Sequence, residues 1–158
     1  MKNTFFLLVM MNTACSGTTG ETKPSAAAET NGTTVSTTSE TAAARHYAGA
    51  FSNGMKGDSI FFDVSADGKT LENLTFKGYW RCSGKLEQTT VGPDGAFNIN
   101  NGKVNDHISE PPDGGSTAWR FDLEADINPT SASGTFRMNI NNLGCDTYKL
   151  NWTAEVRK

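Results

Sequence analysis

The chain contains no apolar run long enough to cross a bilayer and few of the residues on which enzymes most often rely. The longest apolar run covers residues 5–11, far short of the roughly 20 residues that span a bilayer. Only two histidines, His46 and His107, occur in 158 residues. The sequence has no Gly-x-Ser-x-Gly elbow, phosphate-binding loop, His-Glu-x-x-His motif or dinucleotide fingerprint, so the common hydrolase and nucleotide-binding families are disfavoured.

Basic residues are neither numerous nor clustered. The sequence has 14 Lys and Arg against 17 Asp and Glu, which gives a formal net charge of −3. Nucleic acids require a concentrated basic face, and an anionic membrane attracts a polybasic strip, but the sequence has neither. We therefore expect no nucleic-acid partner.

The first 15 residues are laid out as an export signal. Lys2 precedes the apolar run, and small or polar residues then lead to Cys15, which is the order found in secretory signals. The stretch resembles the signal of bacterial lipoproteins, in which the cysteine is lipidated and becomes the new N-terminus. The resemblance implies a signal peptide over residues 1–14 and attachment of Cys15 to the lipid bilayer of a bacterial cell envelope. Ser16 is similar to the sorting pattern of outer-membrane lipoproteins, which agrees with a place on the cell surface.

Two other interpretations of the N-terminus remain open. Lipoprotein signals usually carry an aliphatic residue three positions before the cysteine, where this sequence has Asn12. Ordinary signal cleavage near Ala14 would release the protein, whereas an uncleaved segment would act as an N-terminal anchor. The shortness of the apolar run makes the anchor the weakest of the three interpretations.

Residues 15–45 form a predicted disordered tether. The segment after the cysteine is almost entirely Thr, Ala, Ser, Gly and Glu and contains no aromatic residue. Such a composition buries too little apolar surface to offset the entropy of ordering the chain. A flexible chain of this length has a mean reach of roughly 30 Å, which would hold a folded domain clear of a membrane surface.

Cys82 and Cys145 are the only cysteines in the rest of the chain, residues 46–158. In an exported protein a single internal pair is most simply a disulfide, and this pairing leaves Cys15 for lipidation. Zinc is the alternative, but a structural zinc site needs four Cys or His ligands, and the two histidines are isolated in the sequence. The acidic residues in predicted turns do not follow the EF-hand spacing for calcium. We expect neither a metal nor a cofactor.

The 46–158 segment is predicted to be one domain of antiparallel strands. Apolar side chains alternate with polar or charged ones with a period of two, which indicates strands that are buried on one face. The alternating runs cover residues 60–65, 74–82, 119–126, 136–140 and 148–157. In the last run, Tyr148, Leu150 and Trp152 are expected to point into the core.

Asp-Gly and Asn-Gly pairs separate these runs. They occur in residues 66–69, 93–96 and 100–103, and a longer predicted loop follows at 111–115. Such pairs tolerate the positive φ angles that tight hairpin turns require. Short strands without an amphipathic helix indicate an all-β fold, either a single antiparallel β-sandwich or a small barrel, with one disulfide. The pattern does not decide between sandwich and barrel.

The three tryptophans are expected in the core. Trp80, Trp119 and Trp152 share the parity of their apolar neighbours, and Trp80 lies two residues from Cys82 on the same side of its strand. A sheet that stacks sugar rings needs aromatic residues on its outer face, where Tyr79 is the main example. The pattern therefore disfavours a flat aromatic platform for carbohydrates.

A second resemblance covers roughly residues 47–157. Its motifs are a Gly-x-Phe strand, a cysteine and a Leu-x-Trp-Thr-Ala strand, preceded by Gly-x-Phe and Ile-x-Phe-x-Val stretches. They lie at residues 134–136, 145, 150–154, 49–51 and 60–64. These motifs are similar to those of a recurring secreted bacterial β-domain. The resemblance implies a β-fold with a disulfide and lends no active site.

One hydrophilic segment, residues 105–116, gathers the candidate site residues. We interpret it as a loop that would present a histidine and several carboxylates. These residues are Asp106, His107, Glu110 and Asp113. Long loops on rigid β-scaffolds often carry binding sites. We expect a non-catalytic module of the cell envelope that binds a protein or a glycan or serves the envelope structurally.

Two further functions remain open at this segment. A small hydrolase could use His107 with Asp106 or Glu110, but it would also need a nucleophile in a geometry that a sequence does not show. Alternatively, a protruding loop could inhibit a host lysozyme or protease, which would be a special case of binding.

The lipoprotein interpretation predicts the outcome of one substitution. Cys15→Ser should leave a soluble or unprocessed product, because the acceptor of the lipid is lost. Partition into detergent, compared with the wild-type chain, measures the attachment. A Cys15→Ser protein that is cleaved normally and still enters the detergent phase would contradict the interpretation.

Overall fold

The computed structural model describes residues 43–158, so the predicted signal peptide, Cys15 and nearly all of the predicted tether lie outside the described residues. The elements of the described part are β1 (Arg45–Phe51), β2 (Ser59–Val64), β3 (Thr70–Cys82), β4 (Lys85–Val91), β5 (Phe97–Asn98), β6 (Lys103–Glu110), β7 (Trp119–Ile127), β8 (Ser131–Ile140), the 3-10 helix η1 (Asn141–Leu143), β9 (Cys145–Asp146) and β10 (Leu150–Val156). Within this part of the chain, no helix has the length and apolar character needed to cross a membrane.

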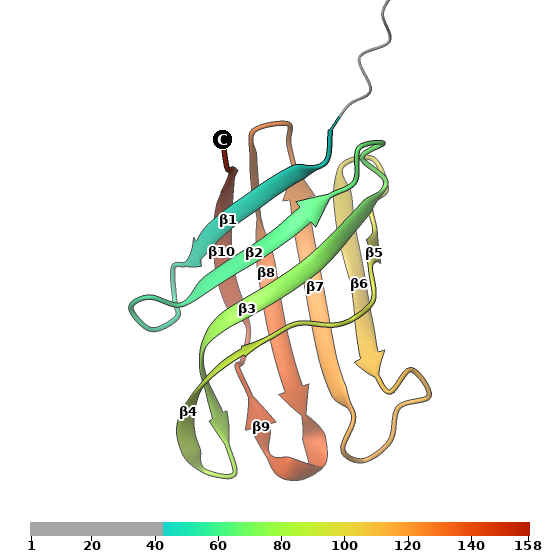
Figure 1. Ribbon diagram of the computed structural model, residues 1–158. Helices are drawn as coiled ribbons and strands as arrows, with labels where there is room; N and C mark the ends of the chain where they lie inside the picture. Colours follow the sequence, from blue (N-terminus) through green and yellow to red (C-terminus); the bar gives the residue numbers. More distant parts are fainter. Residues whose placement is uncertain (1–42) are drawn as a thin grey trace, which may run out of the picture. The chain divides into compact units, whose positions relative to one another are not determined.

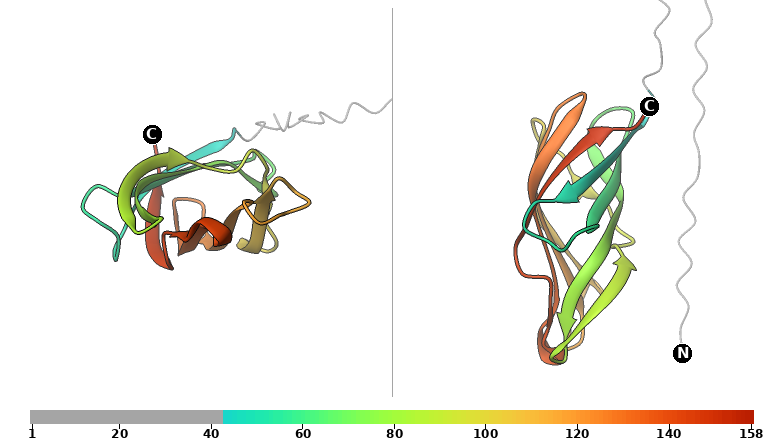
Figure 2. Two further views of the ribbon diagram at one scale, coloured as in Figure 1. Left: turned by 90° about the horizontal axis from the view of Figure 1, so that it is seen from below. Right: turned by 90° about the vertical axis from the view of Figure 1, so that its left-hand side faces the viewer.

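The strands confirm the predicted all-β antiparallel fold, and they close into a barrel. Hydrogen bonds join β1, β2, β3, β9, β8 and β10 in that order, and β10 completes the ring by pairing with both β8 and β1. The ring is flattened, so that β1, β2 and β3 face β10, β8 and β7 as two layers (Figures 1 and 2). The alternation left open whether the fold is a sandwich or a barrel. Because β10 pairs with both β8 and β1, the fold is a closed barrel.

The remaining strands extend the two layers. β7 and β6 continue the sheet from β8, while β4 and β5 both pair with β3. Residues 93–96 are therefore not the hairpin that the sequence predicts, because β4 and β5 follow one another along the same edge of β3. The turn at 66–69 does join the paired strands β2 and β3, and Asn100 and Lys103 bond to each other across the other predicted turn.

Alternate side chains of the strands fill the space between the layers. Most of the residues predicted to point inward are buried, and aromatic rings make up much of the core. Tyr47 stacks on Phe62 with ring centroids 4.9 Å apart, and its hydroxyl donates a hydrogen bond of 2.7 Å to the carbonyl of Asn128. A buried phenol is thus both packed and hydrogen-bonded, as its burial requires.

The tryptophans lie where the alternation predicts. Trp80 and Trp152 are buried, and Trp119 is half-buried and packs against the core. Trp119 stacks on Trp80 with ring centroids 5.1 Å apart. This pair bridges the two layers, because Trp80 belongs to β3 and Trp119 to β7.

Tyr148 departs from the predicted alternation. Its side chain is 61% exposed, and its φ of 57° is in the left-handed region. The cause is local, since the carboxylate of Asp146 accepts a 2.7 Å hydrogen bond from the backbone N–H of Tyr148 and so holds a bend between β9 and β10. The prediction that Tyr148 points into the core is wrong, and regular pairing of β10 begins only at Leu150.

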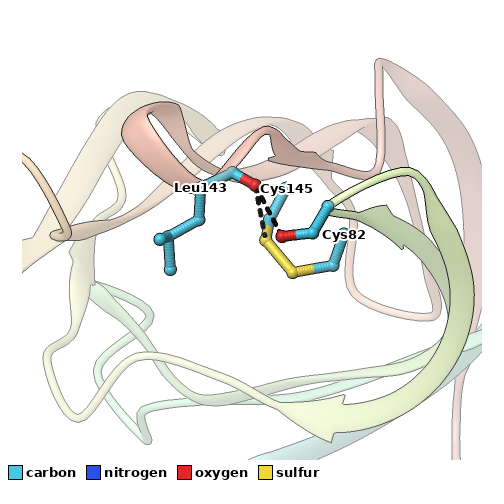
Figure 3. The surroundings of a disulfide bond; sticks show 4 residues. Cys82, Leu143 and Cys145 are labelled. Atoms are coloured by element: carbon cyan, nitrogen blue, oxygen red, sulfur yellow. Dashed lines mark hydrogen bonds between the residues drawn. A yellow bond between two sulfur atoms is a disulfide. The ribbon is translucent and has the colours of Figure 1, made fainter.

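Cys82 and Cys145 form the predicted disulfide, which joins the end of β3 to β9 (Figure 3). Beside it, the hydroxyl of Ser83 donates a 3.1 Å hydrogen bond to the carbonyl of Leu143, and the same oxygen lies 3.7 Å from the Cys145 sulfur. β9 itself pairs with β3 through a single residue pair. The ring is therefore closed at this end chiefly by the disulfide and these side-chain contacts.

A buried carboxylate fills the gap where β2 begins beside β3. Asp58 is 3% exposed and accepts hydrogen bonds from the backbone N–H groups of Met55 at 2.7 Å and Tyr79 at 3.2 Å. The carboxylate oxygens thus accept the hydrogen bonds that backbone carbonyls accept within a sheet, just before β2 begins. Gly78 leaves the room for this, since a Cβ there would lie 2.7 Å from the Asp58 carboxyl carbon.

The disulfide predicts a large loss of stability on reduction or mutation. The two cysteines are 63 residues apart, so Cys82→Ser should lower the free energy of unfolding by about 4 kcal/mol through the entropy of the unfolded chain. Urea unfolding measures this loss. Thiol titration of the unfolded, unreduced Cys15→Ser chain should find no free thiol, and finding two would contradict the bond.

Asp58 should contribute to stability out of proportion to its size. Asp58→Ala leaves the part-buried N–H groups of Met55 and Tyr79 without their acceptor, so we expect a loss of about 2 kcal/mol in the free energy of unfolding. Gly78→Ala should also destabilise the fold, because its methyl group displaces the same carboxylate. Glu87→Ala, at an exposed position of β4, is the control and should stay within about 0.5 kcal/mol of wild type. Equal urea midpoints for all variants would refute this role.

Candidate functional site

The segment 105–116 is not the single loop that the sequence suggests. Its first half belongs to β6, and residues 111–118 connect β6 to β7. Asp106 and His107 are therefore neighbours on an extended strand. The distance between His107 Nδ1 and Asp106 Oδ1 is 3.9 Å, which is too long for a hydrogen bond.

The four candidate residues of this segment do not converge on one site. Glu110 accepts a 2.5 Å hydrogen bond from the backbone N–H of Asp94, and this contact ties the end of β6 to the connection between β4 and β5. Asp113 is exposed in the connection to β7. Only Asp106 and His107 line a common hollow.

That hollow, which we call the polar groove, lies on the outer face of β6, β7 and β8 and has a volume of about 600 Å³. The strand register places His107, Asp122 and Arg137 side by side across the three strands. Alternation directs charged side chains of β7 and β8 to this face, and neighbouring strands bring opposite charges together.

Two arginines of the groove are held by carboxylates. Arg120 donates a 2.9 Å hydrogen bond from Nε to Asp122 Oδ1, and its Nη2 lies 2.7 Å from the same oxygen in an ion pair. Arg137 donates to both oxygens of Asp146, at 2.6 and 3.1 Å, and this hydrogen bonding raises the pKa of the Arg137 guanidinium. Paired hydrogen bonds fix the plane of the Arg137 guanidinium, and Asp122 holds Arg120 through one hydrogen bond and one ion-pair contact.

Asn139 lies in the lining of the groove but is almost fully buried. It has the outward parity of Arg137, yet it is only 5% exposed. In the strand register it lies between Arg120 on β7 and Asp146 on β9. Its amide oxygen has no hydrogen-bond partner among the described residues. A buried polar atom without a partner is uncommon in folded proteins, and polarity patterning gives no sign of it.

His46, which is isolated in the sequence, has a partner in the structure. Its Nδ1 lies 2.5 Å from Asp63 Oδ1, and Asn73 donates a 2.8 Å hydrogen bond to the other oxygen of Asp63. Partial burial opposes ionisation of Asp63, but these hydrogen bonds outweigh it and hold the pKa of the carboxyl below its ordinary value. The pairing of β1 with β2 brings the two side chains together, and no sequence motif reports that register.

A second hollow, of about 380 Å³, lies next to the disulfide end of the barrel. The β1–β2 connection, β3, β4 and the β9–β10 connection all contribute to its wall. Three large apolar side chains line it although they face solvent, with exposures of 61% for Tyr148, 49% for Leu86 and 46% for Met55. We call it the Tyr148 hollow.

Aromatic and cationic groups complete the Tyr148 hollow. Tyr79 and Arg81 reach it from the outer face of β3, and the buried Trp80 lies beneath. Leu143 is also exposed. It lies in η1 at the same end of the barrel, close to the disulfide (Figure 3). Tyr, Trp, Met and Arg are the residues that protein interfaces favour.

Neither hollow has the grouping that a metal centre requires. Across residues 43–158, no three His, Cys, Asp or Glu side chains are placed to hold one ion. The polar groove can supply hydrogen bonds from fixed donors and acceptors. The Tyr148 hollow can bury apolar surface of a ligand next to one guanidinium, that of Arg81.

Comparison with known proteins finds no match among family models, curated proteins or solved structures.

Proposed function

We propose that this domain is a non-catalytic binding module, held on a bacterial cell envelope by lipidated Cys15, that docks a protein partner in the Tyr148 hollow. The observation that carries the proposal is the exposure of Tyr148, Leu86 and Met55 around one hollow. Single exposed apolar residues are ordinary, whereas a contiguous group of them is typical of an interaction surface.

The backbone of Tyr148 supports the proposal. A non-glycine residue in the left-handed region costs of order 1–3 kcal/mol, and such strain tends to persist at functional sites. Asn would adopt this conformation more readily, but it would place no aromatic ring at the hollow. The unfavourable backbone conformation at Tyr148 thus places an exposed aromatic ring at the hollow.

The wall of the hollow is rigid, which favours binding. Asp146 fixes the bend at Tyr148, Asp58 fixes the β1–β2 connection that carries Met55, and the disulfide fixes β9. A site that is already ordered loses less entropy when a partner docks.

The position of the hollow suits a tethered module. β1 begins at Arg45 at one end of the barrel, next to the C-terminus, whereas the β3–β4 turn and η1 lie at the other end (Figures 1 and 2). Leu86 follows directly after that turn. If the chain is anchored through its N-terminal segment, Leu86 and Leu143 are carried at the end remote from the attachment, and the β1–β2 connection with Met55 lies partway along the barrel (Figures 1 and 2).

The chemistry of the hollow defines the partner. An apolar or aromatic side chain of the partner would fill the space between Tyr148, Leu86 and Met55. Arg81 makes no ion pair within residues 43–158, so it can receive a carboxylate. We expect a protein segment that presents an apolar side chain next to an acidic group.

Tyr148→Asn separates binding from stability. Asn tolerates the left-handed conformation, so the unfolding temperature should stay the same or rise by a few degrees. Partner capture should be lost, because the aromatic ring is gone. The measurement combines thermal unfolding with photo-crosslinking in the host cells, using p-benzoylphenylalanine in place of Leu86.

The crosslinking experiment has a matched control position. Thr153 is exposed on β10 and lines neither hollow, so a photo-crosslinker there should not yield the Leu86 adduct. The Leu86 adduct should contain one defined protein and disappear in the Tyr148→Asn background. An identical adduct from Thr153, or an adduct that is unchanged by Tyr148→Asn, would exclude the hollow as the docking site.

A further inference from the structure

The polar groove is a second candidate site on another part of the surface. The segment 146–149 lies between the two hollows, with Lys149 lining the groove and Tyr148 lining the Tyr148 hollow. The groove's volume of about 600 Å³ is within the range of small-molecule sites. Ligand binding in the groove would not depend on protein docking in the Tyr148 hollow.

The charges of the groove are paired with one another. Besides the Arg120–Asp122 and Arg137–Asp146 pairs, Lys149 Nζ lies 3.2 Å from Glu124 Oε1. Each cation thus has a carboxylate beside it. Asp106 is the one further carboxylate of the lining, so the groove offers no cluster of unpaired charge to a phosphate or a polyamine, which would need a cluster of the opposite sign.

The same pairing leaves hydrogen-bonding capacity unused. A guanidinium has five N–H donors, and Arg120 uses only its Nε and Nη2 on Asp122. The hydrogen bond from Nε and the ion-pair contact of Nη2 are both made to Asp122 Oδ1, so Oδ2 keeps its lone pairs. Fixed donors and fixed acceptors therefore stand next to each other along the groove.

Asn139 adds a polar group whose hydrogen-bonding capacity is not satisfied. Its amide oxygen is buried and has no partner among the described residues, although the residue lines the groove. Rotation about the soft terminal torsion exchanges the positions of oxygen and nitrogen, so the amide can offer either an acceptor or a donor. A ligand group that both donates and accepts would satisfy it in either orientation.

We propose that the polar groove binds a neutral saccharide, with one sugar hydroxyl paired to the amide of Asn139 and its neighbours bonded to Arg120 and Asp122. A hydroxyl is both donor and acceptor, and adjacent hydroxyls of a sugar ring present several such groups at fixed spacing. They match alternating N–H donors and carboxylate oxygens without requiring net charge. His107 is half-exposed at the β6 side and supplies a further ring nitrogen.

Saturation-transfer difference NMR tests the proposal on the full chain carrying Cys15→Ser. The probes are lactose, maltotriose, mannobiose and N,N′-diacetylchitobiose, with inorganic phosphate and spermidine as charged competitors. We expect signal transfer to at least one saccharide and no competition from the charged compounds. Absence of transfer to every saccharide, or displacement of the saccharide by phosphate, overturns the proposal.

Substitutions locate the binding. Asn139→Leu replaces an unpaired polar group with an apolar one of similar size, so the unfolding temperature should be unchanged or higher while the saccharide signal disappears. Asp122→Asn, on the outer face, should weaken binding about tenfold or more and gives an answer even if Asn139→Leu fails to fold. Saccharide binding that survives Asp122→Asn unchanged refutes the site.

Two controls separate this proposal from the docking of a protein. Gln88→Leu on β4 and Tyr148→Asn both lie outside the groove, so both should leave the saccharide signal as in wild type. Loss of the saccharide signal with Tyr148→Asn would move the sugar to the Tyr148 hollow and overturn the assignment to the groove. The crosslinking result at Leu86 is independent of either outcome.

Discussion

The bond between Cys82 and Cys145 stands where the hydrogen-bonded ring is weakest. β9 has two residues and meets β3 through one residue pair, so the disulfide is the main link between the layers at this end. Both candidate sites depend on β9 staying in place. The bend at Tyr148 starts from Asp146, and the same carboxylate holds Arg137 in the polar groove. One covalent bond thus positions two unrelated surfaces.

Period-two alternation was sufficient to predict the fold class and most of the core, because nearly every strand has one buried face. The disulfide was predicted separately, from the single pair of internal cysteines in a chain expected to be exported. Alternation carries no information on which strand pairs with which. Barrel closure depends on β10 meeting both β1 and β8, and the contact between His46 and Asp63 depends on the register of β1 with β2. For the same reason, the four candidate residues predicted at 105–116 were grouped as a loop, although half of that segment pairs with β7.

The alternation fails at positions that shape the candidate sites. Tyr148 is exposed and Asn139 is buried, against the predicted alternation, and Asp58, just before the alternating run at 60–65, is also buried although it is charged. Each exception rests on contacts that exist only in three dimensions: a carboxylate that holds a bend, a strand end that needs an acceptor, and an amide between two neighbouring strands. A polarity pattern assigns such residues by their chemistry alone, so it places them on the wrong side. Exceptions of this kind are where strain and function are expected to coincide.

The closure of the ring by β10 also fixes the order in which the domain can be completed. Tyr47, near the start of β1, pairs with Val156, near the end of the chain. The pairing of β1 is therefore incomplete until β10 is in place. Contacts between such distant parts of a chain form slowly. Until β10 is available, β1 and β8 each expose an unpaired edge, the state from which strands of different molecules associate. A chain that is cut short before β10 would therefore be an adhesive open sheet and not a smaller barrel.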